Sequence, residues 1–473
     1  MLRRRLHRFA RAALAALVLP LLLAPAPAVQ AAAAPITFGP PTLVDAVHAF
    51  GEPDIGVDPQ GRVFSSGPTG TGTQRSVWFG SVDGGGSFRL INPGPPASAL
   101  AGQTDSPGGG DTDLNFDRTG KQYFADLYAL TCLRTAVTPD GGSTVAEEIY
   151  PAGCSGVPGA DRQWLAVYDP APGTPHQSAY AGPTPLLYMA YNNLDNGTQW
   201  TKSSDGLTYV AAPLDPPDYA PFGADGYPAI DQQTGKLFQA AGSGNSVLLN
   251  ICTPGATGDL TCLDAPTAAA PSGDTSKLIH VADNLKGDPN TLFCVLSMDS
   301  GRNLYVAFAV GSANPGDRQV FVSAASAASG WTQWTPPVQV SQAPSNVNVF
   351  PWVKAGAPGR ADAVWYGTDT VADPSTDANQ KWNVFMSQVV FPTNAGGGLT
   401  GAAPATTMVK VSPHPNHYHS ICLAGTGCIA SQGNRNLADF FVVTADRSGA
   451  AMVVYPDTSN GLAQQGFTPA NQQ

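Results

Sequence analysis

The sequence predicts an all-β protein, and more specifically a β-propeller. Short β-rich runs alternate with clusters of Gly, Pro, Asn and Asp, and helical periodicity is almost absent after residue 35. Charged residues make up only 12 % of the chain, and 52 Gly and 43 Pro indicate many turns. One unit, consisting of an aspartate, a Gly-containing turn and a strand, also recurs along the chain. Each such unit is a hairpin that must stack on its neighbours to bury both faces, as propeller blades do.

The pattern of the first segment, residues 1–31, predicts a secretory signal peptide. Five arginines precede an apolar run over residues 12–23, and small residues follow with Val29 and Ala31 at the spacing that a signal peptidase accepts. The apolar run is too short to span a bilayer, and no later segment is longer. We therefore expect a secreted protein that starts near residue 32, forms a single propeller domain over residues 32–473, and does not insert into a membrane.

The excess of acidic residues disfavours some classes of binding partner. Without residues 1–31 the chain carries 19 basic and 35 acidic residues. Such an acidic protein is repelled by nucleic acids and by anionic membranes. We expect a monomer without a nucleic-acid partner.

The repeated unit can be followed from the first blade to the last. Six copies begin at an aspartate, and a seventh is expected in the run from residue 350; the aspartates are Asp58, Asp117, Asp169, Asp231, Asp299 and Asp446. Seven inner hairpins favour seven blades, with six as the alternative if one hairpin is an insertion. We expect the run "ITFGPPTLVDAV" (residues 36–47) to supply an outer strand that closes the ring.

A second pattern lies in the outer half of the blades. "SVDGGGSF" (residues 81–88) and "SSDGLTY" (residues 203–209) place an aspartate in a Gly-rich turn before an aromatic residue. A third stretch, "SAASAASGWTQW", keeps the serine and the tryptophan without the aspartate. The aspartate can accept hydrogen bonds from turn amides while glycine adopts a positive φ, so these turns are expected to be structural.

With these turns the sequence resembles the sialidase-like (BNR or Asp-box repeat) superfamily of secreted β-propellers, over residues 45–460. The stretches "GEPDIGVDP", "GADRQWLAVYDP" and "LADFFVVTADRSG" are also similar to it. The resemblance implies a glycoside hydrolase that acts on extracellular glycans. Sialidases hold the sugar carboxylate with three arginines, and here Arg162 and Arg435 could serve as two of them. The first arginine motif of sialidases is replaced by "EPDI", which disfavours an anionic sugar.

Polar residues precede most of the predicted inner strands and form the candidate site. The candidate catalytic acids are Glu52, Asp54, Asp111, Asp161 and Asp225, and the candidate substrate-binding residues are Arg162, Arg435, Asp439 and Tyr227. The converging carboxyl groups have three uses that the sequence leaves open. They could supply acid–base or nucleophilic catalysis on a glycosidic bond, hold a structural Ca²⁺ ion, or form a structural ring with the arginines. No cofactor is expected with certainty.

Two hypotheses about function follow. The first is a hydrolase acting on a neutral or mixed extracellular glycan or polysaccharide. The second is a catalytically silent propeller that binds a glycan or a protein at the mouth of its channel.

Cysteines and histidines add local expectations. The spacing suggests the disulfides Cys132–Cys154, Cys252–Cys262 and Cys422–Cys428, which leaves Cys294 as a buried thiol. His414, His417 and His419 could bind zinc or copper, or simply line a loop.

Overall fold

The computed structural model of the chain describes the following residues: 35–46, 51–68, 76–91, 110–128, 132–150, 160–192, 199–212, 221–223, 225–289, 291–425, 427–431 and 433–459. Residues 1–36 and residues 37–473 form two separate units, and every described strand belongs to the second. The expected signal peptide lies outside the described residues. Within them, no helix has the length and apolar character needed to cross a bilayer.

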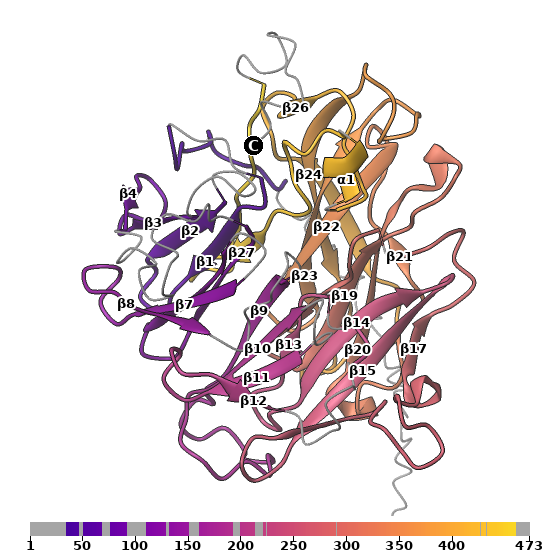
Figure 1. Ribbon diagram of the computed structural model, residues 1–473. Coiled ribbons are helices and arrows are strands. Elements are labelled where there is room, and N and C mark those ends of the chain that lie inside the picture. The colour runs from indigo at the N-terminus through magenta and orange to yellow at the C-terminus, as the bar shows by residue number, and fades with distance from the viewer. Residues whose placement is uncertain are drawn as a thin grey trace, which may run out of the picture. The chain divides into compact units, whose positions relative to one another are not determined.

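The second unit is a β-propeller with six blades, each an antiparallel sheet of four or five strands (Figure 1). The first blade contains β1 (Asp54–Val57), β2 (Val63–Gly67), β3 (Val77–Ser81) and β4 (Arg89–Leu90). The second contains β5 (Thr112–Phe116), β6 (Gln122–Tyr128), β7 (Cys132–Thr138) and β8 (Ala146–Tyr150). The third contains β9 (Asp161–Tyr168), β10 (Leu186–Asn192), β11 (Gln199–Ser203) and β12 (Val210–Ala211).

The second half of the unit repeats this order with two added strands. The fourth blade contains β13 (Ala229–Ile230), β14 (Leu237–Ser243), β15 (Ser246–Pro254) and β16 (Leu260–Cys262), with β17 (Ile279–Ala282) paired to β15. The fifth contains β18 (Val295–Met298), β19 (Asn303–Ala309), β20 (Val320–Ser326) and β21 (Val338–Gln339). The sixth contains β22 (Val347–Ala355), β23 (Arg360–Thr368), β24 (Lys381–Val390) and β25 (Ala405–Lys410), with β26 (His417–Tyr418) paired to β24.

A two-stranded hairpin, β27 (Val443–Ala445) with β28 (Ala451–Val453), follows the sixth blade. Strand β27 contacts both β22 and β1, so the hairpin lies between the last blade and the first (Figure 1). The favoured count of seven blades is wrong, and the alternative of six is confirmed. The reason is that the seventh predicted hairpin gains no outer strands. Closure by the N-terminal run is not confirmed, since residues 35–46 contain no strand.

Short helical turns occupy the loops. Helix α1 covers Gly427–Ser431, and 3₁₀ turns cover Thr275–Lys277, Pro315–Asp317 and Ala327–Ser329.

All seven predicted inner hairpins are present as antiparallel pairs. Apolar side chains gather between adjacent blades, where alternate residues of neighbouring sheets meet.

The outer aspartate turns have the expected structural role. Ser81 donates to the Asp83 carboxylate at 2.6 Å, and the Ser87 amide donates to it at 2.9 Å. Asp205 accepts in the same way from Ser203 and from the amides after it. A further turn of this kind surrounds Asp140, which accepts from the Ser143 and Thr144 amides. Sequence reasoning missed this turn because a threonine replaces the serine and a valine follows in place of the aromatic residue.

The disulfides largely follow the predicted pairs. Cys252–Cys262 and Cys422–Cys428 are confirmed. Cys132 is disulfide-bonded, while its expected partner, Cys154, lies outside the described residues. Cys294 is free and buried, and burial raises the pKa of its thiol to about 12.

Candidate functional site

The predicted site residues gather where the first strands of the blades begin, and we call this end of the channel the strand-start mouth. Glu52 precedes β1, Asp111 precedes β5, and Asp161 opens β9. Two further predicted residues, Arg435 and Asp439, precede β27. The topology thus brings residues nearly 400 positions apart in sequence to one place.

Three carboxyl groups from consecutive blades form a row in this mouth. Asp111 interacts electrostatically with both Glu52 and Asp161, so the three carboxyl groups lie close to one another. Glu52 and Asp111 are buried, whereas the Asp161 side chain is 25 % exposed. Asp161 is therefore the member of the row that solvent can reach.

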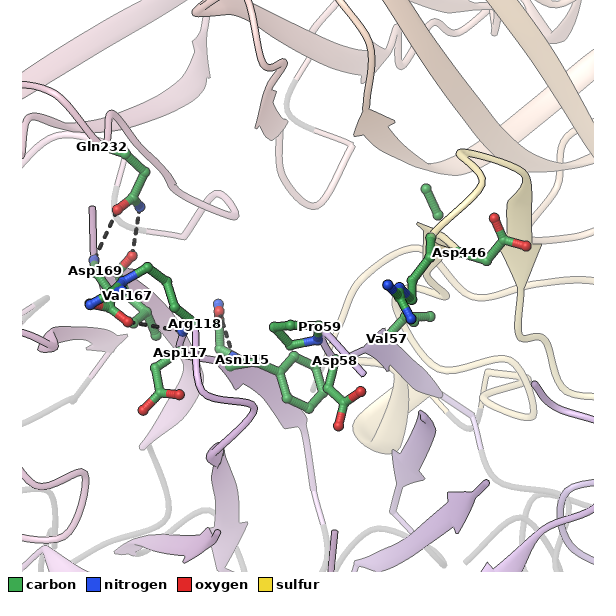
Figure 2. Close-up of a pocket in the computed structure, with 13 residues that line it drawn as sticks. Val57, Asp58, Pro59, Asn115, Asp117, Arg118, Val167, Asp169, Gln232 and Asp446 are labelled. Carbon is green, nitrogen blue, oxygen red and sulfur yellow. Dashed lines mark hydrogen bonds and ion pairs between the residues drawn. The ribbon is translucent and has the colours of Figure 1, made fainter. Parts of the chain in front are cut away.

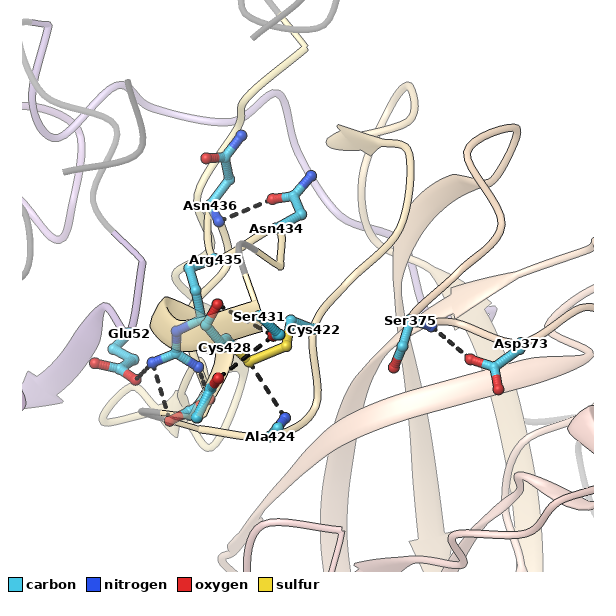
Figure 3. Close-up of a disulfide and its surroundings, with 12 residues drawn as sticks. Glu52, Asp373, Ser375, Cys422, Ala424, Cys428, Ser431, Asn434, Arg435 and Asn436 are labelled. Atoms are coloured by element: carbon cyan, nitrogen blue, oxygen red, sulfur yellow. Dashed lines mark hydrogen bonds and ion pairs between the residues drawn. A yellow bond between two sulfur atoms is a disulfide. The ribbon is translucent and has the colours of Figure 1, made fainter. Parts of the chain in front are cut away.

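Two arginines face this row and meet on a fourth carboxylate. Arg162 Nη2 lies 3.4 Å from Asp439 Oδ2, and Arg435 Nη2 donates to the same oxygen at 3.1 Å. Arg435 Nη2 also lies 3.7 Å from Glu52 Oε1, and Figure 3 shows this guanidinium directed toward Glu52. Arg162 Nε lies 3.7 Å from Asp161 Oδ2. Both guanidinium groups are thus paired with carboxylates of the chain itself.

The row binds protons more tightly than ordinary carboxyl groups do. Burial raises the pKa of Asp161 to about 8, with a further upward contribution from Asp111. Burial and the neighbouring Glu52 raise the pKa of Asp111 well above its usual value. Burial and the charge of Asp439 raise the pKa of Glu52, which Arg435 opposes. Acids that share a confined site cannot all ionise together, so the row keeps protons near neutral pH.

The backbone around the mouth is strained at regular positions. Glu52 and Arg162 have φ values of 53° and 56°, in the left-handed region that favours glycine. Leu292, Phe350 and Ala438 have φ values of 75°, 54° and 50° and lie before or within other first strands. Such strain costs energy and concentrates at functional sites, where it fixes the direction of side chains.

Asp54, the first residue of β1, has partners different from those of the carboxyl row. Its Oδ1 accepts from the Ile55 amide at 2.7 Å, and its Oδ2 accepts from the Leu114 amide of the next blade at 2.7 Å. Burial raises the pKa of Asp54 to about 7. Asp113 makes the equivalent bond to the Leu165 amide. These two carboxyl groups join neighbouring first strands to each other.

Asp225 and Tyr227 occupy the start of the fourth blade. The exposed Asp225 carboxylate accepts from the Asn192 side-chain amide. Half-buried Tyr227 directs its hydroxyl to Asp113, with 3.3 Å between the oxygens, and burial raises its pKa well above the usual value. Tyr227 is therefore held in its neutral form and linked to the Asp113 carboxyl group.

A cluster of five aromatic side chains packs together within the channel, and we call it the aromatic plug. Its members are Trp164, Tyr227, Phe293, Trp352 and Phe440, with ring centroids 4.8–6.2 Å apart. The Arg162 guanidinium lies 4.8 Å from the Phe293 ring centroid. The Arg162 guanidinium therefore packs on one ring of the plug. Sequence reasoning missed the plug, because its members come from separate blades and only the packing of the blades brings them together.

The Cys422–Cys428 disulfide closes a loop beside Arg435 (Figure 3). A Cβ atom added at Gly425 would lie 3.8 Å from Asp439 Oδ2 and 3.9 Å from Arg162 Nη2. The Cys422 amide donates to the Asn434 carbonyl at 2.9 Å, next to Arg435. The disulfide loop therefore lies against the Arg162–Asp439 pair and fixes the segment that carries Arg435.

The three histidines have separate partners. Buried His417 contacts the Thr458 hydroxyl at 2.8 Å, and burial lowers its pKa to about 4. His414 lies 3.4 Å from Asp457, and His419 contacts the Ala378 carbonyl at 2.7 Å. In the part of the chain that the structure describes, no group of three or more His, Cys, Asp or Glu side chains is arranged to hold a metal ion.

Comparison with known proteins gives similarity to solved structures only. No family profile and no curated relative matches the chain. The NanB sialidase of Streptococcus pneumoniae is 11 % identical, with a TM-score of 0.40 over 92 % of this chain and 69 % of that one. A leech intramolecular trans-sialidase is 11 % identical, with a TM-score of 0.37 over 92 % of this chain and 68 % of that one.

A Niastella koreensis GH74 enzyme is 12 % identical, with a TM-score of 0.36 over 76 % of this chain. The chain spans 45 % of that enzyme's length. The similar structures therefore include a sialidase, a trans-sialidase and a GH74 enzyme. At these identities and TM-scores they define no activity for this chain.

Proposed function

We propose that this chain is a secreted glycan-acting propeller, a glycoside hydrolase whose reaction takes place at the strand-start mouth. The observation that carries the proposal is the carboxyl row. Three acids from consecutive blades converge, and only Asp161 reaches solvent. Glycoside hydrolysis commonly uses two carboxyl groups, one to protonate the leaving oxygen and one to assist attack at the sugar carbon.

Asp161 is the proposed general acid. With a pKa of about 8 it holds its proton at neutral pH, and it can donate that proton to a glycosidic oxygen placed at the mouth. After donation, the Arg162 guanidinium 3.7 Å away stabilises the carboxylate. Asp111, which interacts with Asp161, offers a route by which the proton is replaced.

Glu52 is the proposed carboxylate partner. It lies at the other end of the row, and Arg435 favours its charged form. Burial and Asp439 raise the pKa of Glu52 and Arg435 opposes that rise, so the proposal requires Arg435 to keep Glu52 ionised. An ionised Glu52 would then raise the pKa of Asp161 and support its protonated form. Opposite protonation states of two nearby acids are the arrangement that acid–base catalysis requires.

The substrate we propose is a neutral or mixed extracellular glycan. Both arginines of the mouth already bind Asp439, and an anionic sugar would face the carboxyl row as well. Within this proposal the Asp83 and Asp205 turns are Asp boxes, the propeller is a monomer, and residues 1–31 direct its export.

A non-catalytic propeller that binds a glycan or a protein is the second candidate. It is favoured by the burial of Glu52, Asp111 and Asp439 together with both arginines, which also describes a structural ring. In that case the mouth presents a rigid polar surface, and Asp161 serves as a contact without transferring a proton.

The deciding experiment is a screen of the mature protein against chromogenic glycosides of neutral sugars, with sialosides included. We expect turnover of a neutral glycoside that falls by about 100-fold or more in Asp161→Asn. The control is Asp369→Asn, an exposed aspartate after β23 that should leave activity unchanged. Binding of a glycan without turnover of any glycoside would replace the hydrolase proposal with the second candidate.

A further inference from the structure

A cavity of about 430 Å³ lies at the other end of the first strands, away from the strand-start mouth (Figure 2). It opens where the first strands end and their aspartate turns begin, and we call it the turn-end mouth. Its lining comes from the first, second, third and fourth blades and from the β27–β28 hairpin: Val57, Asp58, Pro59, Asn115, Phe116, Asp117, Arg118, Val167, Asp169, Gln232, Ala445, Asp446 and Arg447. The volume is within the range of about 300–1,000 Å³ that is typical of small-molecule sites.

The turn-end mouth is remote from the carboxyl row. Strand β9 begins at Asp161 and is followed by Asp169 of the cavity wall, a span of about 26 Å at about 3.3 Å per residue. The rings of the aromatic plug, among them Trp164 of β9, pack together below the strand-start mouth. A ligand in the turn-end mouth therefore does not touch the proposed catalytic acids.

The acids of the turn-end mouth are largely compensated by their own turns. Asp117 accepts from the Thr119 amide at 2.8 Å, and Asp446 accepts from the Ser448 amide at 2.8 Å. Asp58 accepts from the Gln60 amide at 2.9 Å and also pairs with the Arg62 side chain. Asp58, Asp117 and Asp169 are buried, whereas Asp446 is half-buried, so Asp446 is the aspartate of this mouth that can accept a hydrogen bond from a ligand.

Two arginines supply the donors. Arg118 Nε binds Asp169 Oδ1 at 3.0 Å, and its side chain stays 42 % exposed. Arg447 is exposed and, among the described residues, has no ion pair. The Arg447 stem packs at Gly61, where an added Cβ atom would lie 3.0 Å from Arg447 Cδ. The Arg447 guanidinium is thus placed at the rim by packing and has free N–H groups.

These features select the chemical class of ligand. A large anion would face four aspartates, and a cation would face two guanidinium groups. A neutral molecule rich in hydroxyl groups suits both charges, because its hydroxyl groups can donate to Asp446 and accept from Arg118 or Arg447. Val57, Phe116 and Val167 give the cavity an apolar wall for the C–H face of a sugar ring.

We propose that the turn-end mouth is a second, non-catalytic binding site for a neutral sugar residue, with Arg447 as a principal hydrogen-bond donor. This proposal does not rest on the hydrolase assignment. A propeller with a sugar site at each end of its channel can hold one glycan chain while it meets another, which raises its effective affinity for a polysaccharide.

The test uses the mature protein and measures binding of the methyl glycosides of glucose, galactose, mannose and fucose by ligand-observed NMR and calorimetry. We expect at least one of them to bind and Arg447→Ala to weaken that binding by about ten-fold or more. Arg447→Lys should weaken it less. Asp161→Asn should leave this binding unchanged, whether or not it abolishes turnover.

The controls separate a local effect from loss of folding. Lys410→Ala changes an exposed cation on β25 and should alter neither binding nor the melting temperature. Because Arg447 is exposed, Arg447→Ala should retain the wild-type melting temperature. The proposal is overturned if no neutral glycoside binds, if binding resists Arg447→Ala, or if glucuronate or inorganic sulfate competes better than the neutral sugars do.

Discussion

Replacing Trp164 with alanine should destabilise the propeller more than most other single substitutions. Trp164 is 1 % exposed, and its ring centroid lies 5.3–6.0 Å from Tyr227, Phe293, Trp352 and Phe440. These partners come from three other blades and from the segment before β27. The indole N–H also donates to the Asp225 carbonyl at 3.2 Å.

The expected magnitude follows from the ring packing that the truncation removes. Truncation of a buried tryptophan to alanine costs about 3–5 kcal/mol, and each aromatic pair contributes about 0.5–1.5 kcal/mol beyond its buried area. With four ring partners we expect Trp164→Ala to lower the free energy of unfolding by about 5 kcal/mol. Trp164→Phe keeps a ring in place and loses the indole hydrogen bond, for about 1–2 kcal/mol.

The assay is equilibrium unfolding in urea, followed by far-UV circular dichroism because the substitution removes a fluorophore. The control is Trp334→Ala, since Trp334 is half-buried and its N–H donates to the Trp331 carbonyl without a place in the plug. We expect Trp334→Ala to cost less than half as much. A loss below about 2 kcal/mol for Trp164→Ala, or a loss equal to that of the control, would refute the view that the plug joins the blades.

Three further predictions follow. Between its usual pKa of 3.8 and its folded pKa of about 8, Asp161 binds more protons in the folded state than in the unfolded state. The free energy of unfolding should therefore fall as the pH rises from 5 to 8, and it should fall less in Asp161→Asn. Urea unfolding at both pH values measures this difference. If Asp161 is the acid, turnover should decline above pH 8. The turn amides lower the pKa of Asp205, so its small stabilising contribution should be present above pH 4 and be lost as pH falls further. The contribution should be absent in Asp205→Ala, as urea unfolding would measure. Thiol titration without reductant should find no reactive thiol in the native protein and one, Cys294, in denaturant; three would show that Cys132 and Cys154 are unpaired.

Local patterns in the sequence predicted the hairpins well. The aspartate–glycine turns at Asp58 and Asp117 are encoded by adjacent residues, because the carboxylate and the positive φ of glycine act within one turn. The pair Cys252–Cys262 follows from spacing for the same reason. The number of blades was predicted less well, since an inner hairpin such as β27–β28 looks the same in sequence whether or not outer strands join it.

The sequence predicted which residues belong to the candidate site better than it predicted how they are placed relative to one another. Glu52, Asp111 and Asp161 were selected because each precedes an inner strand, and the structure brings the three together. The same criterion selected Asp54, which instead binds backbone amides of two strands. Only Pro53 stands between Glu52 and Asp54 in the chain, and the left-handed backbone at Glu52 is invisible in the sequence.

The sequence by itself determined the all-β class, the hairpin repeat and the acidic character of the channel, because these depend on residue type and on contacts between near neighbours. Only the tertiary structure decided that the ring has six blades, that Arg162 and Arg435 share Asp439, and that five aromatic side chains pack within the channel. Those features join residues hundreds of positions apart. The packing of one blade against the next brings them together, and no local pattern records it.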